Sequence, residues 1–476
     1  MSPSWLWRRM RAMGPAEIAW RLASMVRHAA MRAAPRWAPI VQGSSGPALE
    51  IDLGEVDGEA RRAITATARS WLEHRGSFLW LRDVDLGPTI DWHRDYASAR
   101  VAPRRYSAFI DHRDPHRVGD VKVVWELNRL QHLVLLALAG RLEGDDAFRA
   151  EVAAQTRGWR QQNPFLTGIN WKSPMEAGLR LLSWSFVAAV APGTLDGDAF
   201  VELLDRHQRF VRAFHSRYSS ANNHLVAEMV GLYAAATMWP GLAASAARRR
   251  YARERLVDAL VEQVEADGVH RERAIEYQVF VTELFLTAGA LGEAAGDPFP
   301  APYWDRLASM LDFLVAARRH GPRLPAWGDG DGAIVVPPAL DLGDRSAALV
   351  DLRAAADDGG DIAPTTRLWR RLLLWGVDAR RLPLAAEAPP ASHLTAFADG
   401  GFFFLSDGPG GAGMSVAFDA GELGLAPTFA HGHADALSFC LSWAGREFLI
   451  DPGTGNYYAD ELHRDYLRGT AAHNTV

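Results

Sequence analysis

Hydrophobic residues recur at intervals of three and four along most of the chain between about residues 56 and 377. This interval is that of one face of an α-helix. It predicts long helices over residues 120–140, 174–190, 198–214, 223–238, 248–267, 272–295 and 303–319. Pro-Gly, Asp-Gly and Asp-Pro pairs separate several of them and mark turns. Successive long helices with short links are typical of stacked antiparallel helix pairs, in a bundle, a solenoid or a toroid.

The pattern changes after about residue 380. Residues 394–407 and 414–419 are rich in apolar and aromatic side chains and are bounded by glycine clusters, which predicts strands. Residues 439–443 and 447–450 flank a turn at Gly445 and predict a β-hairpin. Helices followed by strands indicate two separate units, first α and then β.

These shifts divide the chain into four parts. We expect a basic N-terminal arm over residues 1–55, a helical domain over 56–380, a linker over 381–392 and an antiparallel β-sheet domain over 393–476. The last part is short and stops in what reads as a strand. We therefore expect that the chain ends inside its second domain, so that this domain is incomplete.

Composition narrows the class of protein. The chain has 476 residues, enough for at least two domains with a large core. Its hydrophobic share of 48% and charged share of 23% are ordinary for a soluble globular enzyme. A formal net charge of −6 argues against a generally basic nucleic-acid-binding protein. Cys440 is the only cysteine, so no internal disulfide forms.

The N-terminal arm is rich in arginine and holds a single acid, Glu17, within residues 1–36. Charges interrupt every apolar run there, so we see no signal peptide and expect a cytoplasmic protein, with a periplasmic or envelope location as the alternative. No apolar run is long enough for a transmembrane helix. A basic amphipathic arm can lie on a membrane or a polyanion, but we favour packing of the arm against its own domain.

A histidine-rich stretch lies near the end of the chain. If residues 429–439 form a strand, its period of two places His431, His433 and Asp435 on one face. Downstream, a buried strand ends on Asp451, and His473 lies close to the C-terminus. These residue types suit Zn²⁺ or a similar divalent ion, while the alternative is unrelated structural histidines.

Polar clusters also precede two of the predicted helices. Asn222, Asn223 and His224 lead into an apolar run, and such residues either cap a helix or hold a carboxylate at its positive end. Tyr277 falls in the opening turns of another helix. A tyrosine among cationic groups ionises more easily than usual and can serve as an acid or a base.

Two further clusters are ambiguous. Glu176 and Arg180 follow Trp171 at one helix start, and their spacing of four is equally that of an ordinary ion pair. Trp327, Asp329 and Asp331 lie in a glycine-rich segment that lacks the ligand pattern of a calcium loop and reads as a turn.

Together these clusters resemble the heparinase II/III-like polysaccharide lyases in order and spacing, over roughly residues 120–476. The resemblance rests on Trp171, Glu176, Arg180, Asn222, Asn223, His224, Asp267, Gly268, Glu272, Tyr277, the Gly-Asp-Gly-Asp segment 328–331, the His-Gly-His-Ala-Asp segment 431–435, the Asp-Pro-Gly segment 451–453 and the His-Asn-Thr segment 473–475. It implies an (α/α) toroid followed by an antiparallel β-sandwich, with the active site in the cleft between them.

The resemblance also implies residue roles. The family cleaves glycans at a uronic acid by β-elimination, and an acidic polysaccharide is the expected substrate. The implied catalytic residues are Asn223, His224, Tyr277 and His431, and the implied structural metal ligands are His433, Asp451 and His473, for one ion such as Zn²⁺. Our candidates for substrate binding are Trp171, Glu176, Arg180, Asn222, Glu272, Trp327 and Asp329.

Two other functions stay open at this point. Toroids of this kind also host glycoside hydrolases that use two carboxylates, which Glu176, Glu272, Asp329 and Asp331 would supply. The third hypothesis is a non-catalytic protein that binds glycan or assists exopolysaccharide biosynthesis.

Overall fold

The structure is a computed structural model of the chain. It describes residues 13–33, 46–319, 321, 323–337, 345–354, 362–384, 392–407, 413–458 and 460–476. The predicted linker over 381–392 lies largely outside the described residues, as do the first twelve residues of the arm and its stretch 34–45. The chain forms two compact units, Met1–Arg255 and Leu256–Val476.

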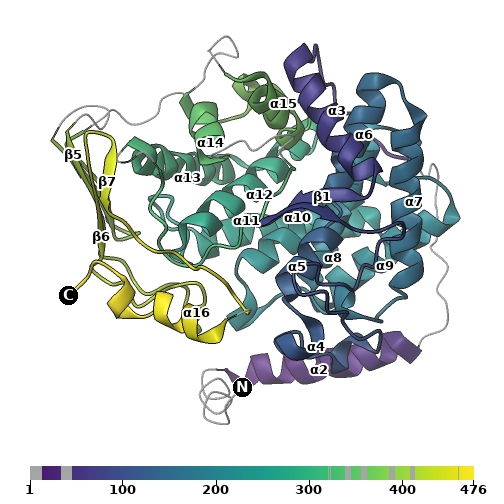
Figure 1. Ribbon diagram of the computed structural model, residues 1–476, viewed down its shortest axis with the longest axis horizontal. Coiled ribbons are helices and arrows are strands. Elements are labelled where there is room, and N and C mark those ends of the chain that lie inside the picture. Colours follow the sequence, from purple (N-terminus) through teal and green to yellow (C-terminus); the bar gives the residue numbers. More distant parts are fainter. Residues whose placement is uncertain are drawn as a thin grey trace. The chain divides into compact units, whose positions relative to one another are not determined.

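The regular secondary structure of the first unit is mostly helical (Figure 1). Its only two described strands, β1 (Arg75–Phe78) and β2 (Leu81–Asp85), form an antiparallel pair. Its helices are α2 (Pro15–Ala33), α3 (Gly58–Leu72), α4 (Pro115–Val118), α5 (Val121–Asn128), α6 (His132–Glu143), α7 (Asp146–Gln162), α8 (Pro174–Val190), α9 (Asp198–Phe214) and α10 (Asn223–Met238), and α11 (Ser245–Gln263) runs on into the second unit.

The hydrophobic pattern predicts these helices well where it is uninterrupted. The predicted bounds of α8, α9 and α10 are confirmed residue for residue. The single helix predicted over 120–140 is wrong, because α5 ends at Asn128 and Leu130 adopts a left-handed backbone conformation with φ of 61° before α6 begins. An apolar run does not reveal such a break, since Leu130 itself is fully buried.

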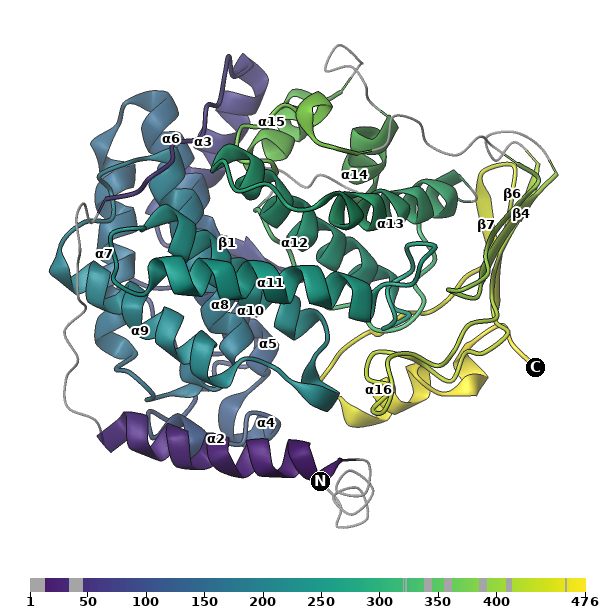
Figure 2. The same ribbon diagram turned by 180° about the vertical axis from the view of Figure 1, so that it is seen from behind.

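Helices α8 and α10 lie side by side at the centre of the first unit (Figures 1 and 2). Two glycines permit this close approach. A Cβ atom on Gly231 would lie 2.0 Å from the carbonyl oxygen of Gly178, and one on Gly178 would lie 2.9 Å from the carbonyl oxygen of Ala227. Nearly every side chain of both helices is buried, so the pair forms the core of the unit.

Helix α2, the described part of the basic arm, packs back on its own unit. Its Glu17 accepts a hydrogen bond of 2.6 Å from the Ser219 hydroxyl, and its Arg27 donates one of 2.6 Å to the carbonyl oxygen of Ala213. The expectation of an arm that packs against its own domain is therefore confirmed for these residues. None of the described helices is long and apolar enough to cross a membrane.

The second unit combines helices with a sheet. The helices are α12 (Ile275–Ala294), α13 (Ala301–Arg319), α14 (Arg345–Ala354), α15 (Pro364–Leu373) and α16 (Glu461–Leu467). The antiparallel sheet has the order β3-β4-β5-β6-β7, with β3 (Leu394–Phe397), β4 (Phe402–Ser406), β5 (Met414–Asp419), β6 (Phe439–Trp443) and β7 (Arg446–Leu449). The predicted hairpin is confirmed as β6 and β7, while the predicted strand 394–407 is two strands joined by a turn.

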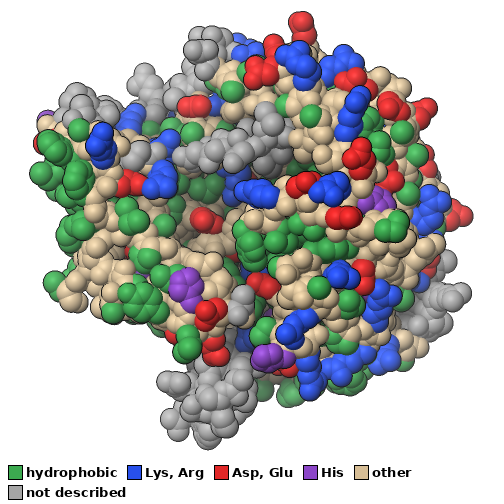
Figure 3. Space-filling model, in the orientation of Figure 1, with side chains coloured by type: hydrophobic (Ala, Val, Ile, Leu, Met, Phe, Trp, Pro, Cys, Tyr) green, Lys and Arg blue, Asp and Glu red, His purple; other side chains and the backbone are tan. Residues whose placement is uncertain are grey.

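One face of the sheet packs on α13. The Phe313 ring of α13 lies within 6 Å of the rings of Phe397, Phe402 and Phe404, with centroid distances of 5.0, 5.6 and 5.8 Å. The opposite face carries exposed apolar side chains, among them Trp443, and Figure 3 shows hydrophobic side chains gathered over this sheet at the left. The second compact unit begins at Leu256, so it contains both α13 and the sheet that packs on it.

The fold class predicted from the sequence, helices followed by an antiparallel sheet, is confirmed. One local prediction fails. Residues 429–438 form no strand, because Phe429, His431 and Leu437 all have positive φ angles, of 46°, 72° and 64°. The chain therefore turns repeatedly through this stretch, and the alternation of His431, His433 and Asp435 does not describe one face of a strand.

Candidate active site and metal centre

A tyrosine and a histidine face each other in the second unit. Tyr277 lies in the first turn of α12, and its ring centroid lies 4.2 Å from that of His431. The hydroxyl groups of Tyr277 and Tyr457 form a hydrogen bond of 2.7 Å. The Tyr457 hydroxyl lies 3.5 Å from Nδ1 of His431. Two phenol groups are thus held beside one imidazole.

Tyr277 holds its proton tightly. Burial raises its pKa well above the ordinary value of 10, and the nearby Asp331 and Tyr457 raise it further. The sequence-based interpretation of a tyrosine that ionises easily among cations is wrong, because a buried environment and acidic groups dominate. A protonated phenol can donate a proton to a leaving oxygen.

Asp329 connects two histidines. Its Oδ2 accepts a hydrogen bond of 3.0 Å from Nδ1 of His431, and its Oδ1 accepts one of 3.0 Å from Nε2 of His433. Nη2 of Arg464 donates to both oxygens, at 2.8 and 3.0 Å. Burial alone would raise the pKa of Asp329, but the two histidines and Arg464 hold it well below its usual range. Asp329 is therefore a carboxylate that only accepts hydrogen bonds.

The backbone around Asp329 explains how it reaches both histidines. Its N–H donates a hydrogen bond of 2.8 Å to the carbonyl oxygen of His431. Gly328 precedes it with φ of 70°, and a Cβ there would lie 2.7 Å from the Cβ of Ala274 and 2.8 Å from the His431 carbonyl oxygen. Only glycine fits this close approach.

The bonds to Asp329 fix the proton on each ring. Because the carboxylate only accepts, Nδ1 of His431 and Nε2 of His433 are the protonated nitrogens. In the neutral imidazole, Nε2 of His431 then carries a lone pair and can accept a proton. Nδ1 of His433 carries a lone pair in the same way and can bind a metal ion.

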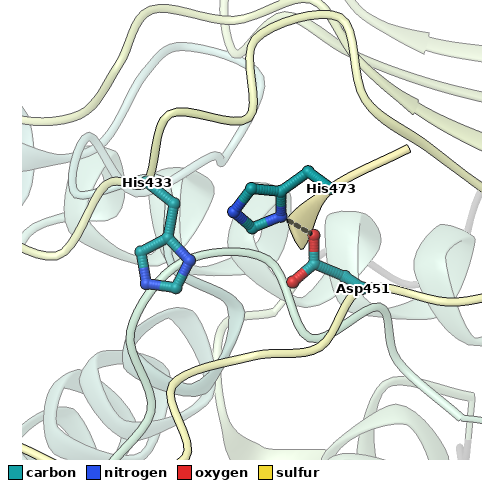
Figure 4. Close-up of side chains that lie close together, drawn as sticks. All are labelled: His433, Asp451 and His473. Atoms are coloured by element: carbon teal, nitrogen blue, oxygen red, sulfur yellow. Dashed lines mark hydrogen bonds and ion pairs between the residues drawn. The ribbon is translucent and has the colours of Figure 1, made fainter. Parts of the chain in front are cut away.

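His433, Asp451 and His473 come together as a potential metal site (Figure 4). One ligand atom from each lies within 4.8 Å of the other two, and all three residues are buried. Nδ1 of His473 donates a hydrogen bond of 2.8 Å to Oδ2 of Asp451. Among the described side chains, Nδ1 of His433 and Nε2 of His473 are buried nitrogens without a hydrogen-bond partner.

This donor set fits a divalent metal. Two imidazole nitrogens and a carboxylate are ligands that Zn²⁺ prefers, and each histidine donates its other N–H to a carboxylate, as metal-binding histidines do. A buried polar atom without a partner is costly unless something binds it. The three residues predicted as metal ligands are therefore brought together, which the sequence spacing alone left open.

In the first unit, Asn222 caps helix α10. Its Oδ1 accepts a hydrogen bond of 3.1 Å from the backbone N–H of His224. Asn223 is the first residue of the helix and is 1% exposed, while His224 is partly exposed. The capping alternative thus holds for Asn222, and the catalytic roles predicted for Asn223 and His224 stay predictions.

Glu176 and Arg180 do not pair with each other as the spacing of four allows. Glu176 instead accepts a two-pronged ion pair from Arg129, at 3.0 and 3.1 Å. Arg180 donates to the Asn170 carbonyl oxygen at 2.7 Å and to Nε2 of His207 at 3.1 Å. Both side chains therefore hold helix α8 to the segments around it.

Comparisons with known proteins identify the family of this chain. The model of the heparinase II/III N-terminus matches residues 48–333, and that of the heparinase II/III-like C-terminal region matches residues 389–476. The chain belongs to the heparinase II/III-like family. The family resemblance carried by the ordered clusters is thereby confirmed. No curated protein matches the chain.

Solved structures of this family share the fold. A heparinase III structure has a TM-score of 0.62 and 17% identity, with coverage of 95% of this chain and 66% of that one. The structure of the heparinase III BT4657 gene product has a TM-score of 0.54 and 18% identity, and the match covers 95% of this chain and 66% of that one. The structure of heparan sulfate lyase HepC from Pedobacter heparinus has a TM-score of 0.51 and 20% identity, and the match covers 94% of this chain and 64% of that one. The chain thus spans just under two thirds of the length of these family members.

Several residues predicted to bind substrate lie inside the family fold. The exposed fraction is 2% or less for Trp171, Glu176, Arg180, Glu272, Trp327 and Asp329. Side chains with so little exposed surface support the structure around them: the Trp327 ring, for example, stacks on Phe402 at 5.0 Å. Direct contact of these six with a substrate stays a prediction.

Sequence reasoning missed Tyr457 and Arg464. Tyr457 bonds to Tyr277, and Arg464 pairs with Asp329 from helix α16. The only signal in the sequence is the position of Tyr457 shortly after the Asp-Pro-Gly turn at 451–453. An arginine on a short helix gives no signal of its own.

Proposed function

We propose that this member of the heparinase II/III-like family is a polysaccharide lyase that cleaves an acidic, uronate-containing glycan by β-elimination. The observation that carries the proposal is the contact between the Tyr277 ring and His431, whose Nδ1 is held by Asp329. Family membership and the names of the solved structures, which include a heparan sulfate lyase, support it.

The chemistry requires an acid and a base. β-Elimination removes the proton on C5 of the uronate and expels the glycosidic oxygen from C4, which leaves a double bond between these carbons. Nε2 of His431 is suited to take the C5 proton, because Asp329 holds the other nitrogen protonated. Tyr277, with its raised pKa, is suited to give a proton to the leaving oxygen.

The uronate carboxylate must also be neutralised, since its charge disfavours the carbanion that forms beside it. In our proposal Asn223 and His224, at the start of helix α10, serve this role. An amide and an imidazole at the positive end of a helix favour a carboxylate. This assignment rests on the family resemblance.

The proposal includes one structural divalent metal ion such as Zn²⁺, held by His433, Asp451 and His473. Such an ion would hold together the three chain segments that carry these residues. Because His433 shares Asp329 with His431, the ion would also fix the position of the proposed base.

Two of the four carboxylates considered for hydrolysis, Asp329 and Glu176, lack the property that a hydrolase's general acid needs. A glycoside hydrolase needs one carboxylic acid whose pKa is raised so that it can donate a proton. Asp329 has the opposite property, with a pKa well below the usual range, and Glu176 is held by Arg129.

The first test is the absorbance of the unsaturated product on a panel of heparan sulfate, hyaluronan, chondroitin, alginate and bacterial exopolysaccharides. Tyr277→Phe and His431→Ala should each lower the rate ~10²–10⁴-fold on the responsive glycan, the usual contribution of a general acid or base. Tyr466→Phe removes a hydroxyl from a side chain that is 60% exposed on helix α16 and should leave the rate unchanged.

Equal rates for Tyr277→Phe and the Tyr466→Phe control would contradict the proposed acid. Binding of a glycan without any product absorbance would instead support the non-catalytic, biosynthesis-accessory alternative.

A further inference from the structure

A cavity in the first unit is lined by basic side chains from three places in the sequence. Its volume is about 410 Å³, within the range of small-molecule sites. Helix α2 contributes Trp20 and Arg27, the end of α9 with the loop after it contributes four basic residues, and α11 contributes one. The basic lining residues are Arg27, Arg209, Arg212, His215, Arg217 and Arg248.

Only part of this positive charge is neutralised within the cluster. Asp205 is shared by two of the arginines, since it pairs with Arg209 and, at 2.8 Å, with Arg248. The described contacts of Arg27, Arg212 and Arg217 are with neutral groups. Arg27 donates to the Ala213 carbonyl oxygen, and the Arg212 guanidinium lies 3.7 Å from the centroid of the Tyr251 ring.

His215 is a neutral member of the cluster. Its Nδ1 donates to the Arg212 carbonyl oxygen at 3.2 Å, so its Nε2 is free to accept. That nitrogen accepts hydrogen bonds of 2.9 Å from Arg217 and 2.8 Å from the Tyr251 hydroxyl. Burial and the charge of Arg217 lower the pKa of His215 to about 4. His215 therefore orients Arg217 without adding a charge.

A second observation, on Arg248, also points to a ligand in this cavity. Arg248 is only 6% exposed, and it lines the cavity. Its Nη2 pairs with Asp205, but its Nη1 is buried and has no hydrogen-bond partner among the described residues. A buried guanidinium nitrogen without an acceptor is costly, and an oxyanion in the cavity would supply the acceptor.

We propose that this cavity is a binding site for a sulfate- or phosphate-type oxyanion, separate from the Tyr277–His431 group and independent of the proposed lyase activity. Guanidinium groups bind such oxyanions with paired hydrogen bonds. An anion would relieve the mutual repulsion of Arg27, Arg212 and Arg217 and satisfy Nη1 of Arg248. The cavity is large enough for the anion to be carried on a saccharide.

The test is equilibrium dialysis of the full chain with labelled inorganic sulfate at constant ionic strength. We expect one saturable site per chain. The double variant Arg212→Gln/Arg217→Gln should bind at least ~10-fold more weakly, because it loses two charge-assisted donors. The matched control Arg62→Gln/Arg69→Gln removes two exposed arginines from α3 and should bind as the natural chain does. Equal binding by both double variants would overturn the proposal.

A second measurement needs no variant. Phenylglyoxal modifies accessible arginines, and mass spectrometry locates the modified residues. Sulfate should slow the modification of Arg212 and Arg217 but not that of Arg62, and unchanged rates at all three would overturn the proposal. A heparin disaccharide that protects at much lower concentration than sulfate identifies a glycan-borne anion, while equal protection identifies the free anion as the ligand.

Discussion

At the scale of single residues, Asp329 links the proposed catalytic group to the proposed metal centre. One carboxylate holds Nδ1 of His431 and Nε2 of His433, so it sets the free nitrogen on both rings. From the sequence, Asp329 is part of a glycine-rich turn and a candidate for substrate binding or hydrolysis, but not the partner of the two histidines. Asp329 contacts His431 and His433, which lie 102 and 104 positions away along the chain. A local sequence pattern cannot predict a contact over such a distance.

Replacing this residue tests the link. Asp329→Asn should weaken Zn²⁺ binding ~10–100-fold, the usual effect of losing the partner of a metal-binding histidine, and should also abolish most activity. Tyr277→Phe should lower activity and leave Zn²⁺ binding unchanged, because the hydrogen bond and ring contact described for Tyr277 are with Tyr457 and His431 and not with the three metal ligands.

The measurement is metal content per chain by mass spectrometry, followed by a chelator titration of each variant. An Asp329→Asn variant that keeps one tightly bound Zn²⁺ would show that Asp329 does not orient His433.

At the scale of elements, the close pair α8 and α10 positions two of the predicted clusters. Helix α8 carries Glu176 and Arg180, and helix α10 begins at Asn223. The approach of the two backbones depends on Gly178 and Gly231. Hydrophobic periodicity predicted both helices, but a glycine in a helix is not by itself a sign of close packing.

Gly231→Ala should destabilise the chain by ~1–3 kcal/mol, the usual cost of overpacking a core, because the new methyl group would meet the Gly178 carbonyl oxygen at 2.0 Å. The control is Gly158→Ala on α7, where the nearest atom, Nε1 of Trp92, would lie at an ordinary 3.8 Å. There the better helix propensity of alanine should stabilise by ~0.5–1 kcal/mol.

Thermal unfolding of both variants beside the natural chain gives the answer. If Gly231→Ala melts at or above the temperature of Gly158→Ala, the close contact of the two helices is not a constraint on the fold.

At the scale of the whole molecule, the sequence predicts the order of helices and strands along the chain better than it predicts which distant residues come into contact. The period of three and four reveals helices such as α9, and the glycine-bounded strands reveal the sheet. The alternation of His431 and His433 suggests a strand and misleads, since positive φ angles turn the chain there. The metal cluster needs residues from distant segments, so spacing alone left it open.

Elimination by the Tyr277–His431 group can be distinguished from hydrolysis by the products that the natural chain forms. The glycan that responds in the absorbance panel would be cleaved in water labelled with heavy oxygen and analysed by mass spectrometry. Elimination should give a fragment that lacks the mass of one water, carries a 4,5-unsaturated uronate and contains no heavy oxygen. Saturated fragments that contain heavy oxygen would show hydrolysis and contradict it.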